Sequence, residues 1–205
     1  MESLDRIQHI KAEDIPNIDL YMDQVTTFMD SRLRSSVRHP GDDKILTKTM
    51  INNYAKNDLL PPPVKKKYSK EHVLLLIFIY YYKGVMSITD IQTLLSPITE
   101  KYFQNDKEFK LEDVYNEVFT LEESEIAYLK EDVAHKFKLA EETFAGVPAE
   151  DREFLCKFSF ICLLSYDVYV KKLMIEKLVD ELAANGQQYK AGKHDKHKKE
   201  NAGEE

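Results

Sequence analysis

Residues 46–72 read LTKTMINNYAKNDLLPPPVKKKYSKEH, and the order of parts in this stretch decides the fold. A short segment with helical periodicity comes first, because Met50, Ile51 and Tyr54 recur at the spacing of one helix face. Three prolines then end that helix, since proline lacks a backbone N–H and clashes with the preceding turn. Three lysines and a tyrosine precede a new apolar run. The order predicts a helix, a small exposed ribbon and another helix.

Positive charge gathers in the same part of an acidic chain. The 205 residues have a formal net charge of −7, with 29 Lys and Arg against 36 Asp and Glu. Residues 44–72 contain seven lysines and two acidic residues, a local charge of +5, so the remainder carries −12. Such polarity allows an acidic protein to present one cationic face to a polyanion.

Four helices are expected in the first 100 residues. They cover the amphipathic segment 18–33, a segment capped by Thr47, the run from Lys70 to about Lys83 capped by Ser69, and a segment from the approximate capping box Ser87–Asp90 to about Pro97. On the first helix, an apolar stripe begins at Tyr21 and ends at Leu33. The polar stretch 64–68 between the second and third helices suits an edge ribbon or loop.

The composition changes after residue 100. An acidic helical segment ends at Gly146, and a second long segment opens at Pro148 and closes at Asn185-Gly186. Because the second segment is apolar almost all round between Phe154 and Val170, we expect other helices or a second copy of the chain to surround it. Residues 187–205 form a charged, low-complexity tail that is expected to be disordered.

The two cysteines lie on this last helix. Cys156 and Cys162 are six residues apart, roughly 9 Å along a helix axis, which is too far for a disulfide bond. We therefore expect both to be small residues of the core.

The order of parts from residue 45 to 98 resembles the winged DNA-binding domain of the MerR (mercury-resistance regulator) family. In that family a recognition helix runs into Gly-Leu-Leu-Pro, a basic wing follows, and two further helices complete the domain. The corresponding stretches here are MINNYAKNDLLPPP, KKKYSKEH and KGVMSITDIQTLL. The resemblance implies a mainly α fold: a MerR-like winged helix-turn-helix with a small β-wing, plus a C-terminal helical domain. We expect domains at 1–100 and 101–186.

The sequence departs from the MerR pattern at three places. Asn52-Asn53-Tyr54 stands where relatives carry Arg-Tyr-Tyr, Asp58 replaces the glycine before Leu-Leu, and lysine replaces the wing arginine. Lysine is a point charge without the bidentate fork of arginine, so attraction to phosphate is kept while shaped recognition is weakened.

A longer part of the chain resembles a more narrowly defined family. The wording IDLYMDQVTTFMD, followed by the stretch from LTKTMINNYAK to SITDIQTLL, is similar to the uncharacterised bacterial "domain of unknown function 1836" family over residues 15–120 or more. This resemblance implies no activity.

Two groups of residues form the expected DNA-binding site. Lys48, Thr49, Asn52, Asn53 and Lys56 lie on the polar face of the second helix, and Lys65, Lys66 and Lys67 lie in the wing. Asparagine can pair with both polar groups of an adenine edge, and lysine can reach guanine or phosphate. The alternatives are an ordinary solvated helix face and a charged loop that protects a sheet edge from aggregation.

The expected function is transcription regulation in the bacterial cytoplasm, by a homodimer that binds double-stranded DNA. The alternative is a protein-interaction module, or adaptor, that kept the fold without DNA binding. We expect no enzyme activity, cofactor or metal site, since phosphate-loop, nucleophile-elbow and H-E-x-x-H motifs do not occur. The longest apolar run, residues 73–82, is about half the length of a membrane span, so no membrane partner is expected. Any small-molecule effector is unknown.

Overall fold

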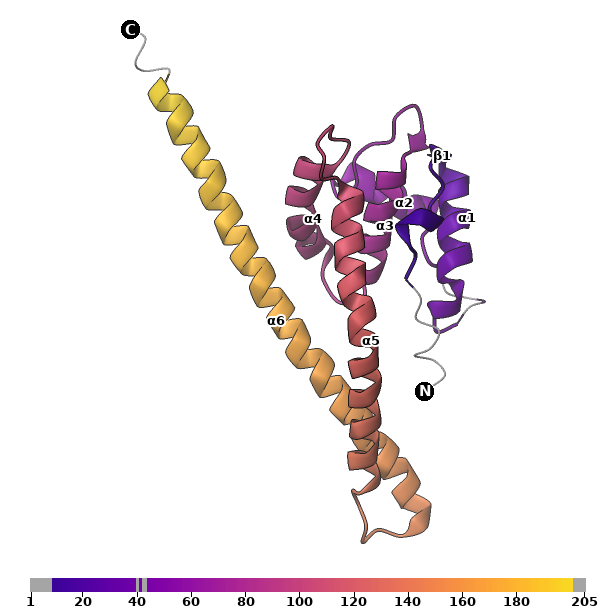
Figure 1. Cartoon of the computed structure of the whole chain (residues 1–205). Helices are drawn as coiled ribbons and strands as arrows, with labels where there is room; N and C mark the ends of the chain where they lie inside the picture. Colours follow the sequence, from indigo (N-terminus) through magenta and orange to yellow (C-terminus); the bar gives the residue numbers. More distant parts are fainter. Residues whose placement is uncertain (1–8, 40, 42–43, 201–205) are drawn as a thin grey trace.

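The computed structural model of the chain describes residues 9–39, 41 and 44–200. This part is mainly helical, with a small two-stranded antiparallel sheet. The elements are β1 (Leu20–Tyr21), α1 (Met22–Leu33), α2 (Lys48–Lys56), β2 (Lys67–Tyr68), α3 (Lys70–Tyr82), α4 (Ile88–Tyr102), α5 (Leu111–Glu141) and α6 (Ala149–Glu200), with 3₁₀ turns at Ala12–Asp14 and Arg34–Ser36. Figure 1 shows α1–α4 gathered around the first half of α5, whose second half pairs with α6.

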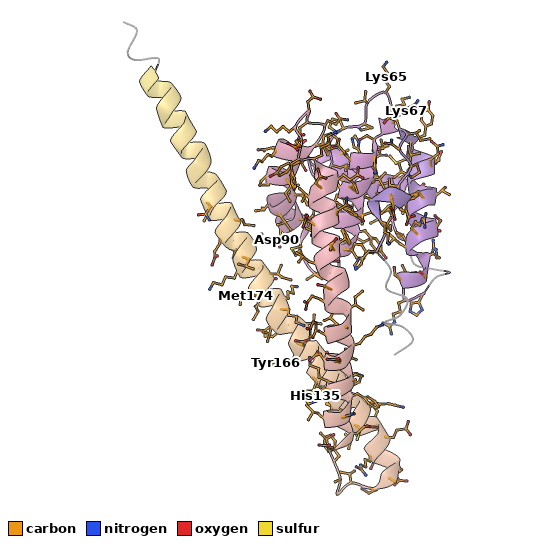
Figure 2. The ribbon with its side chains drawn as sticks, viewed as in Figure 1. Lys65, Lys67, Asp90, His135, Tyr166 and Met174 are labelled. Carbon is orange, nitrogen blue, oxygen red and sulfur yellow. The ribbon has the colours of Figure 1, made fainter. Side chains whose placement is uncertain are left out.

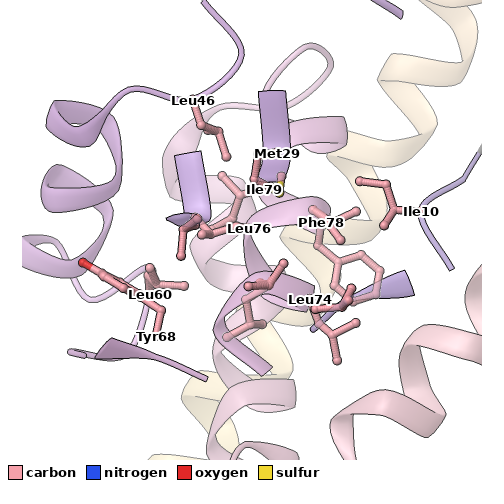
Figure 3. Close-up of a cluster of buried hydrophobic side chains, with 14 of the residues drawn as sticks. Ile10, Met29, Leu46, Leu60, Tyr68, Leu74, Leu76, Phe78 and Ile79 are labelled. Carbon is pink, nitrogen blue, oxygen red and sulfur yellow. The ribbon is translucent and has the colours of Figure 1, made fainter. Parts of the chain in front are cut away.

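Helix α3 is the centre of the N-terminal body. Every side chain from Val73 to Ile79 is buried, so this helix has no solvent-facing side in its middle two turns. Its neighbours come from α1, α2, α4, α5 and the sheet, and their buried side chains form one cluster around it (Figure 3). The all-round apolar sequence of α3 is therefore satisfied by wrapping, as expected for such a helix.

The sheet joins the start of the chain to the ribbon that follows α2. Leu20 pairs with Tyr68 and Tyr21 pairs with Lys67 in antiparallel register. The predicted edge ribbon is thus present, with a strand partner that the sequence did not reveal. The prediction that Tyr21 belongs to the apolar stripe of the first helix is wrong: Tyr21 is an exposed strand residue and the N-cap of α1. Its position in the extended strand turns the side chain away from the core.

Helix α4 begins as predicted but ends later. Ser87 and Asp90 form the reciprocal capping box, with Asp90 N donating to Ser87 Oγ over 3.1 Å. The prediction that the helix closes near Pro97 is wrong, because α4 continues to Tyr102 with the proline inside. Proline removes one backbone hydrogen bond. Packing of Ile98 and Tyr102 against the core stabilises the continuation.

The first turns of α5 belong to the same core. Leu111, Tyr115 and Phe119 are buried with the side chains of α3, and the Tyr115 hydroxyl donates a hydrogen bond to the carbonyl of Ile10. The buried cluster thus extends from Ile10 to Phe119. The domain boundary expected at residue 100 stays a prediction.

Beyond the core, α5 and α6 form an antiparallel hairpin (Figure 1). Helices α5 and α4 contact α6 but do not wrap it, since Phe154 is 69% exposed and Ile161 is 59% exposed. The expectation that other helices of the chain surround α6 is therefore wrong, and the alternative cover, a second copy of the chain, stays a prediction. Cys156 is half-buried and Cys162 is exposed, so the prediction of a core position fails for Cys162. Burial fails because α5 covers only one side of α6.

The end of α6 also differs from the prediction. The helix does not close at Asn185-Gly186 but extends to Glu200. The disorder that the composition predicts for residues 187–205 stays a prediction. Lysine, alanine, glutamine and glutamate, which dominate that segment, are good helix formers. Residues 201–205 lie outside the described part of the chain. None of the described helices has the combination of length and hydropathy that a membrane crossing requires.

Candidate nucleic-acid interface

Helix α2 presents the first group of predicted site residues on one side. Thr47 caps the helix, since its side chain accepts a hydrogen bond from the Met50 backbone N–H over 3.1 Å. Ile51 and Tyr54 are buried and fix the inner face of α2 against the core. The five predicted residues are all exposed or partly exposed: Lys48, Thr49, Asn52, Asn53 and Lys56. The structure therefore brings this group together on the outer face of one short helix.

A tight turn ends α2 at the position where the MerR pattern has glycine. Asp58 has φ of 57°, in the left-handed region, and the N–H groups of Leu59 and Leu60 both bond to the Tyr54 carbonyl, over 2.9 and 3.1 Å. The two leucines are buried. Asp is among the few non-glycine residues that adopt this conformation with some ease, which explains how the departure is tolerated.

The wing lysines lie in a two-residue hairpin turn. Val64 and Lys67 exchange both backbone hydrogen bonds, over 2.9 and 3.1 Å, and the residues between them have positive φ: 51° at Lys65 and 64° at Lys66. Such turns usually contain Asn-Gly or Asp-Gly, because the left-handed conformation costs an ordinary residue roughly 1–2 kcal/mol. The chain therefore holds two exposed lysines in a conformation that disfavours them.

Lys67 differs from the two residues at the tip. It is half-buried, pairs with Tyr21 in the sheet, and its Nζ lies 5.2 Å from the centroid of the Tyr21 ring. Figure 2 shows Lys65 at the outer end of the hairpin and Lys67 nearer to the body. The three wing lysines thus divide into two exposed tip charges and one charge held over an aromatic ring.

An ion pair links one end of α2 to the base of the hairpin. Lys48 pairs with Asp23, which lies two residues after the sheet residue Tyr21. At the other end of α2, Gln92 of α4 donates to the carbonyl of Asn57 over 3.1 Å. Lys48 therefore lies on the hairpin side of the face and Lys56 at the opposite end, next to α4.

Sequence reasoning missed the partners of these lysines. Asp23 and Tyr21 both contact predicted site lysines, but nothing in their sequence spacing indicated it, because they come from another element. Lys70, which contributes to the local charge of +5, is instead bonded to Glu112 of α5 over 2.8 Å. It holds α3 to α5 rather than adding to the exposed cationic surface.

A buried histidine supports the base of the hairpin. His72 Nδ1 accepts a hydrogen bond from the Ser69 backbone N–H over 3.0 Å, and its ring packs edge-on against Tyr68 and Phe103. Burial lowers the pKa of His72 below its ordinary value of 6.5, while the nearby carbonyls of Pro62 and Pro61 and the charge of Asp19 oppose that shift. The folded state therefore favours the neutral ring.

The chemistry of this surface is that of charge and hydrogen bonding. The predicted residues contribute ammonium ions, amides and a hydroxyl, and the carboxylates of Asp23 and Asp58 lie beside them. In the described residues, no three His, Cys, Asp or Glu side chains converge where they could hold a metal ion.

The fold is mainly helical, with α3 at its centre, and its surface includes the polar face of α2 and the hairpin with Lys65 and Lys66 at its tip. The chain belongs to the family known as domain of unknown function DUF1836, whose model matches residues 10–118. The match has nearly the same limits as the buried cluster from Ile10 to Phe119. No curated protein and no solved structure matches the chain.

Relief of the hairpin strain gives the first prediction. Replacing both tip residues, Lys65→Asn with Lys66→Gly, should raise the free energy of unfolding by about 1 kcal/mol, because these residues accept positive φ. Urea denaturation followed by circular dichroism measures the change. Lys65→Ala with Lys66→Ala is the matched control: it removes the same charges and keeps the strain, so no gain is expected. Equal gains in both variants would attribute the effect to charge.

The pKa of His72 gives a second prediction. Because the folded state lowers this pKa, the associated stability is complete above about pH 6.5 and is lost as the pH falls below it, when the unfolded chain binds the proton first. His72→Asn keeps an acceptor for the Ser69 N–H but cannot titrate. The difference in unfolding free energy between pH 7.5 and 5.5 should be smaller in this variant than in the wild type.

His135, an exposed residue of α5, is the control position for this measurement. His135→Asn should leave the wild-type pH dependence in place. If His72→Asn kept the full wild-type pH dependence, His72 would not be the group responsible.

Proposed function

We propose that this protein binds duplex DNA through a MerR-like winged helix-turn-helix formed by residues 45–98, and that it regulates transcription in the bacterial cytoplasm. In this proposal α2 is the recognition helix, which enters the major groove, and the hairpin at residues 64–67 is the wing. Asn52 reads a base edge, while the lysines of both elements contact phosphates.

The observation that carries the proposal is the hairpin tip. Lys65 and Lys66 are both exposed and both have positive φ, although Asn-Gly would form the same turn with less strain. Residues held in unfavourable backbone conformations are found at functional sites more often than elsewhere. Two adjacent positive charges at the end of a projecting turn suit contact with a polyanion such as a phosphate backbone.

The face of α2 supports the same proposal. Its outward side chains are two lysines, two asparagines and a threonine, and these residue types donate hydrogen bonds to base edges and phosphates. The start of α2 lies next to the first turn of α1, where Lys48 pairs with Asp23, and the strand before that turn pairs with the hairpin, so one nucleic-acid duplex could contact both elements.

Protein binding is the second candidate function, and the acidic residues of the same surface favour it. Asp23 neutralises Lys48, Asp58 is exposed at the end of α2, and the residues outside 44–72 carry a charge of −12. An adaptor with mixed charges on this face would bind a protein and show no affinity for duplex DNA, even at low salt.

Salt dependence of duplex binding gives the third prediction. Selection from a random duplex library, followed by fluorescence anisotropy between 50 and 200 mM salt, should give a binding constant that falls steeply with salt. The variant with Lys65→Asn and Lys66→Gly should bind every duplex more weakly. Its slope of log K against log salt should flatten by up to about 0.9 for each phosphate that the variant no longer neutralises.

The double-alanine variant should flatten the slope to the same extent, since the two variants share the charge change and differ in turn strain. Absence of duplex binding by the wild type at 50 mM salt would favour the adaptor. A slope that is unchanged in both variants would show that the two lysines contact no phosphate and belong to an ordinary solvated loop.

Base recognition gives the fourth prediction. Asn52→Ala should weaken binding to the selected duplex by roughly 1–3 kcal/mol and binding to random duplex by much less, because only a base contact depends on sequence. Asn53→Ala, at the neighbouring exposed position, is measured beside it. Equal losses on selected and random duplex would show that Asn52 does not read bases.

A further inference from the structure

Helix α6 exposes far more apolar surface than a monomer normally leaves in water. Its exposed large apolar side chains are Phe154, Phe158, Ile161, Tyr166, Val168, Tyr169, Val170, Leu173, Met174, Leu178 and Leu182. At roughly 100 Å² for each of these half-exposed side chains, they amount to about 1,000 Å². Monomers rarely expose contiguous apolar patches above a few hundred Å². Four of these side chains, Phe154, Phe158, Ile161 and Val168, share one side of the helix and expose about 400 Å² together, and side chains beside them would supply the rest of the roughly 800 Å² that each partner of a standard interface contributes.

The contacts within the chain account for only one side of α6. Near its start the helix packs on α5, where the rings of Phe137 and Phe160 lie 5.4 Å apart and Lys136 bonds to Asp167 over 3.3 Å. Farther along, α6 contacts α4, and Val179 is buried there. Figures 1 and 2 show α6 crossing the far end of α5 and then running away from it toward α4.

Part of the exposed surface forms a regular row. The row consists of Phe154, Phe158, Ile161, Ser165, Val168, Lys172, Ile175 and Val179, at alternating spacings of four and three residues. This is the heptad spacing of helices that pack along their length. The row lies about a third of a turn around the helix from the α5-facing residues Phe160 and Asp167. Its last member, Val179, is covered, while the members from Phe154 to Val168 are exposed.

We propose that two copies of this chain associate through this row, with α6 of one protomer antiparallel to α6 of its partner. A two-fold axis near the middle of the exposed row, between Ile161 and Ser165, places Phe154 beside the partner copy of Lys172, and Phe158 beside that of Val168. Such an interface is self-complementary and uses the portion of the row that α4 does not reach. Ser165 allows close approach of the two helices near the axis.

The distribution of charge selects the antiparallel direction. The first turn of α6 carries Glu150 and Asp151, and Lys171 and Lys172 lie about twenty residues later. Antiparallel pairing about this axis brings Asp151 and Glu153 of each copy within about one helical turn of Lys171 and Lys172 of the other, although it also places Glu150 opposite the partner copy of Glu176. Parallel pairing would instead place acid beside acid and lysine beside lysine, which is unfavourable. Lys171 and Lys172 already pair within the helix with Asp167 and Glu176, and such exposed pairs are weak enough to rearrange.

Sedimentation velocity of the full chain without DNA tests the proposal and does not depend on the proposed function. Between 1 and 100 µM the 24.0 kDa chain should sediment as a dimer. Phe158→Glu with Ile161→Glu should sediment as a monomer with an unchanged circular dichroism spectrum, because both side chains are exposed within one chain. A wild-type monomer at 100 µM would overturn the proposal.

The matched control is Tyr166→Glu with Met174→Glu, which adds the same two negative charges at similarly exposed positions of α6 outside the row. This double variant should remain dimeric. Its dissociation, as well as that of the row variant, would show that a different surface of α6 mediates association, and would overturn the assigned row.

Cysteine crosslinking tests the direction. In a background with Cys156→Ser and Cys162→Ser, protomers carrying Phe154→Cys should form disulfides only when mixed with protomers carrying Lys172→Cys. In the antiparallel pair, two copies of residue 154 are separated by about 27 Å along the axis, well beyond disulfide reach. If either single variant crosslinked with itself and the mixture formed no disulfide between residues 154 and 172, the arrangement would be parallel and the antiparallel one would be overturned.

Discussion

Complete burial of α3 is the constraint on which the N-terminal body depends. Seven consecutive residues, Val73 to Ile79, are buried, and a helix that is apolar on every side cannot remain next to water. The chain satisfies it by surrounding α3 with elements drawn from residues 10 to 119, including the first turns of α5. The family match over residues 10–118 therefore corresponds to one physical unit rather than to a piece of a core.

The two ends of α3 also hold the candidate interface in place. At its start, Ser69 and His72 form the reciprocal cap directly after β2, so the hairpin ends where the buried helix begins. At its end, Lys83 donates to the carbonyl of Ile45 over 2.7 Å, just before the cap of α2, and burial lowers the pKa of that lysine. The outward positions of α2 and the hairpin thus follow from contacts with a helix that lies outside the candidate interface.

The helical pair formed by α5 and α6 differs from the N-terminal body. Helices α5 and α6 each have apolar side chains in excess of what a two-helix contact can cover, and α6 leaves α5 to run along α4. The apolar side chains of the N-terminal body are buried by one another, whereas many of those on α5 and α6 remain exposed. In the proposed dimer, pairing of the two α6 helices would place the two candidate interfaces at a fixed separation.

Local sequence was sufficient for the helices and for much of the site. Thr47, Ser69 and Ser87 predicted three helix starts, because capping depends on hydrogen bonds within one turn. The exposed face of α2 was also predictable, since helical periodicity separates Ile51 and Tyr54 from the polar positions. The prolines and lysines before α3 excluded a core strand but left an edge ribbon and a loop open, and the structure has the ribbon at Lys67–Tyr68.

Contacts between distant elements were decided only by the tertiary structure. The pairing of Tyr21 with Lys67, of Lys48 with Asp23 and of Lys70 with Glu112 depends on packing around α3, which no local pattern encodes. The continuation of α4 past Pro97 depends on the core contacts that follow the proline. The apolar pattern of α6 predicted that other residues pack against it, but it did not show whether they come from the same chain or from a second copy. Periodicity fixes which side chains share a face, whereas the neighbour that covers a face is set by the path of the whole chain.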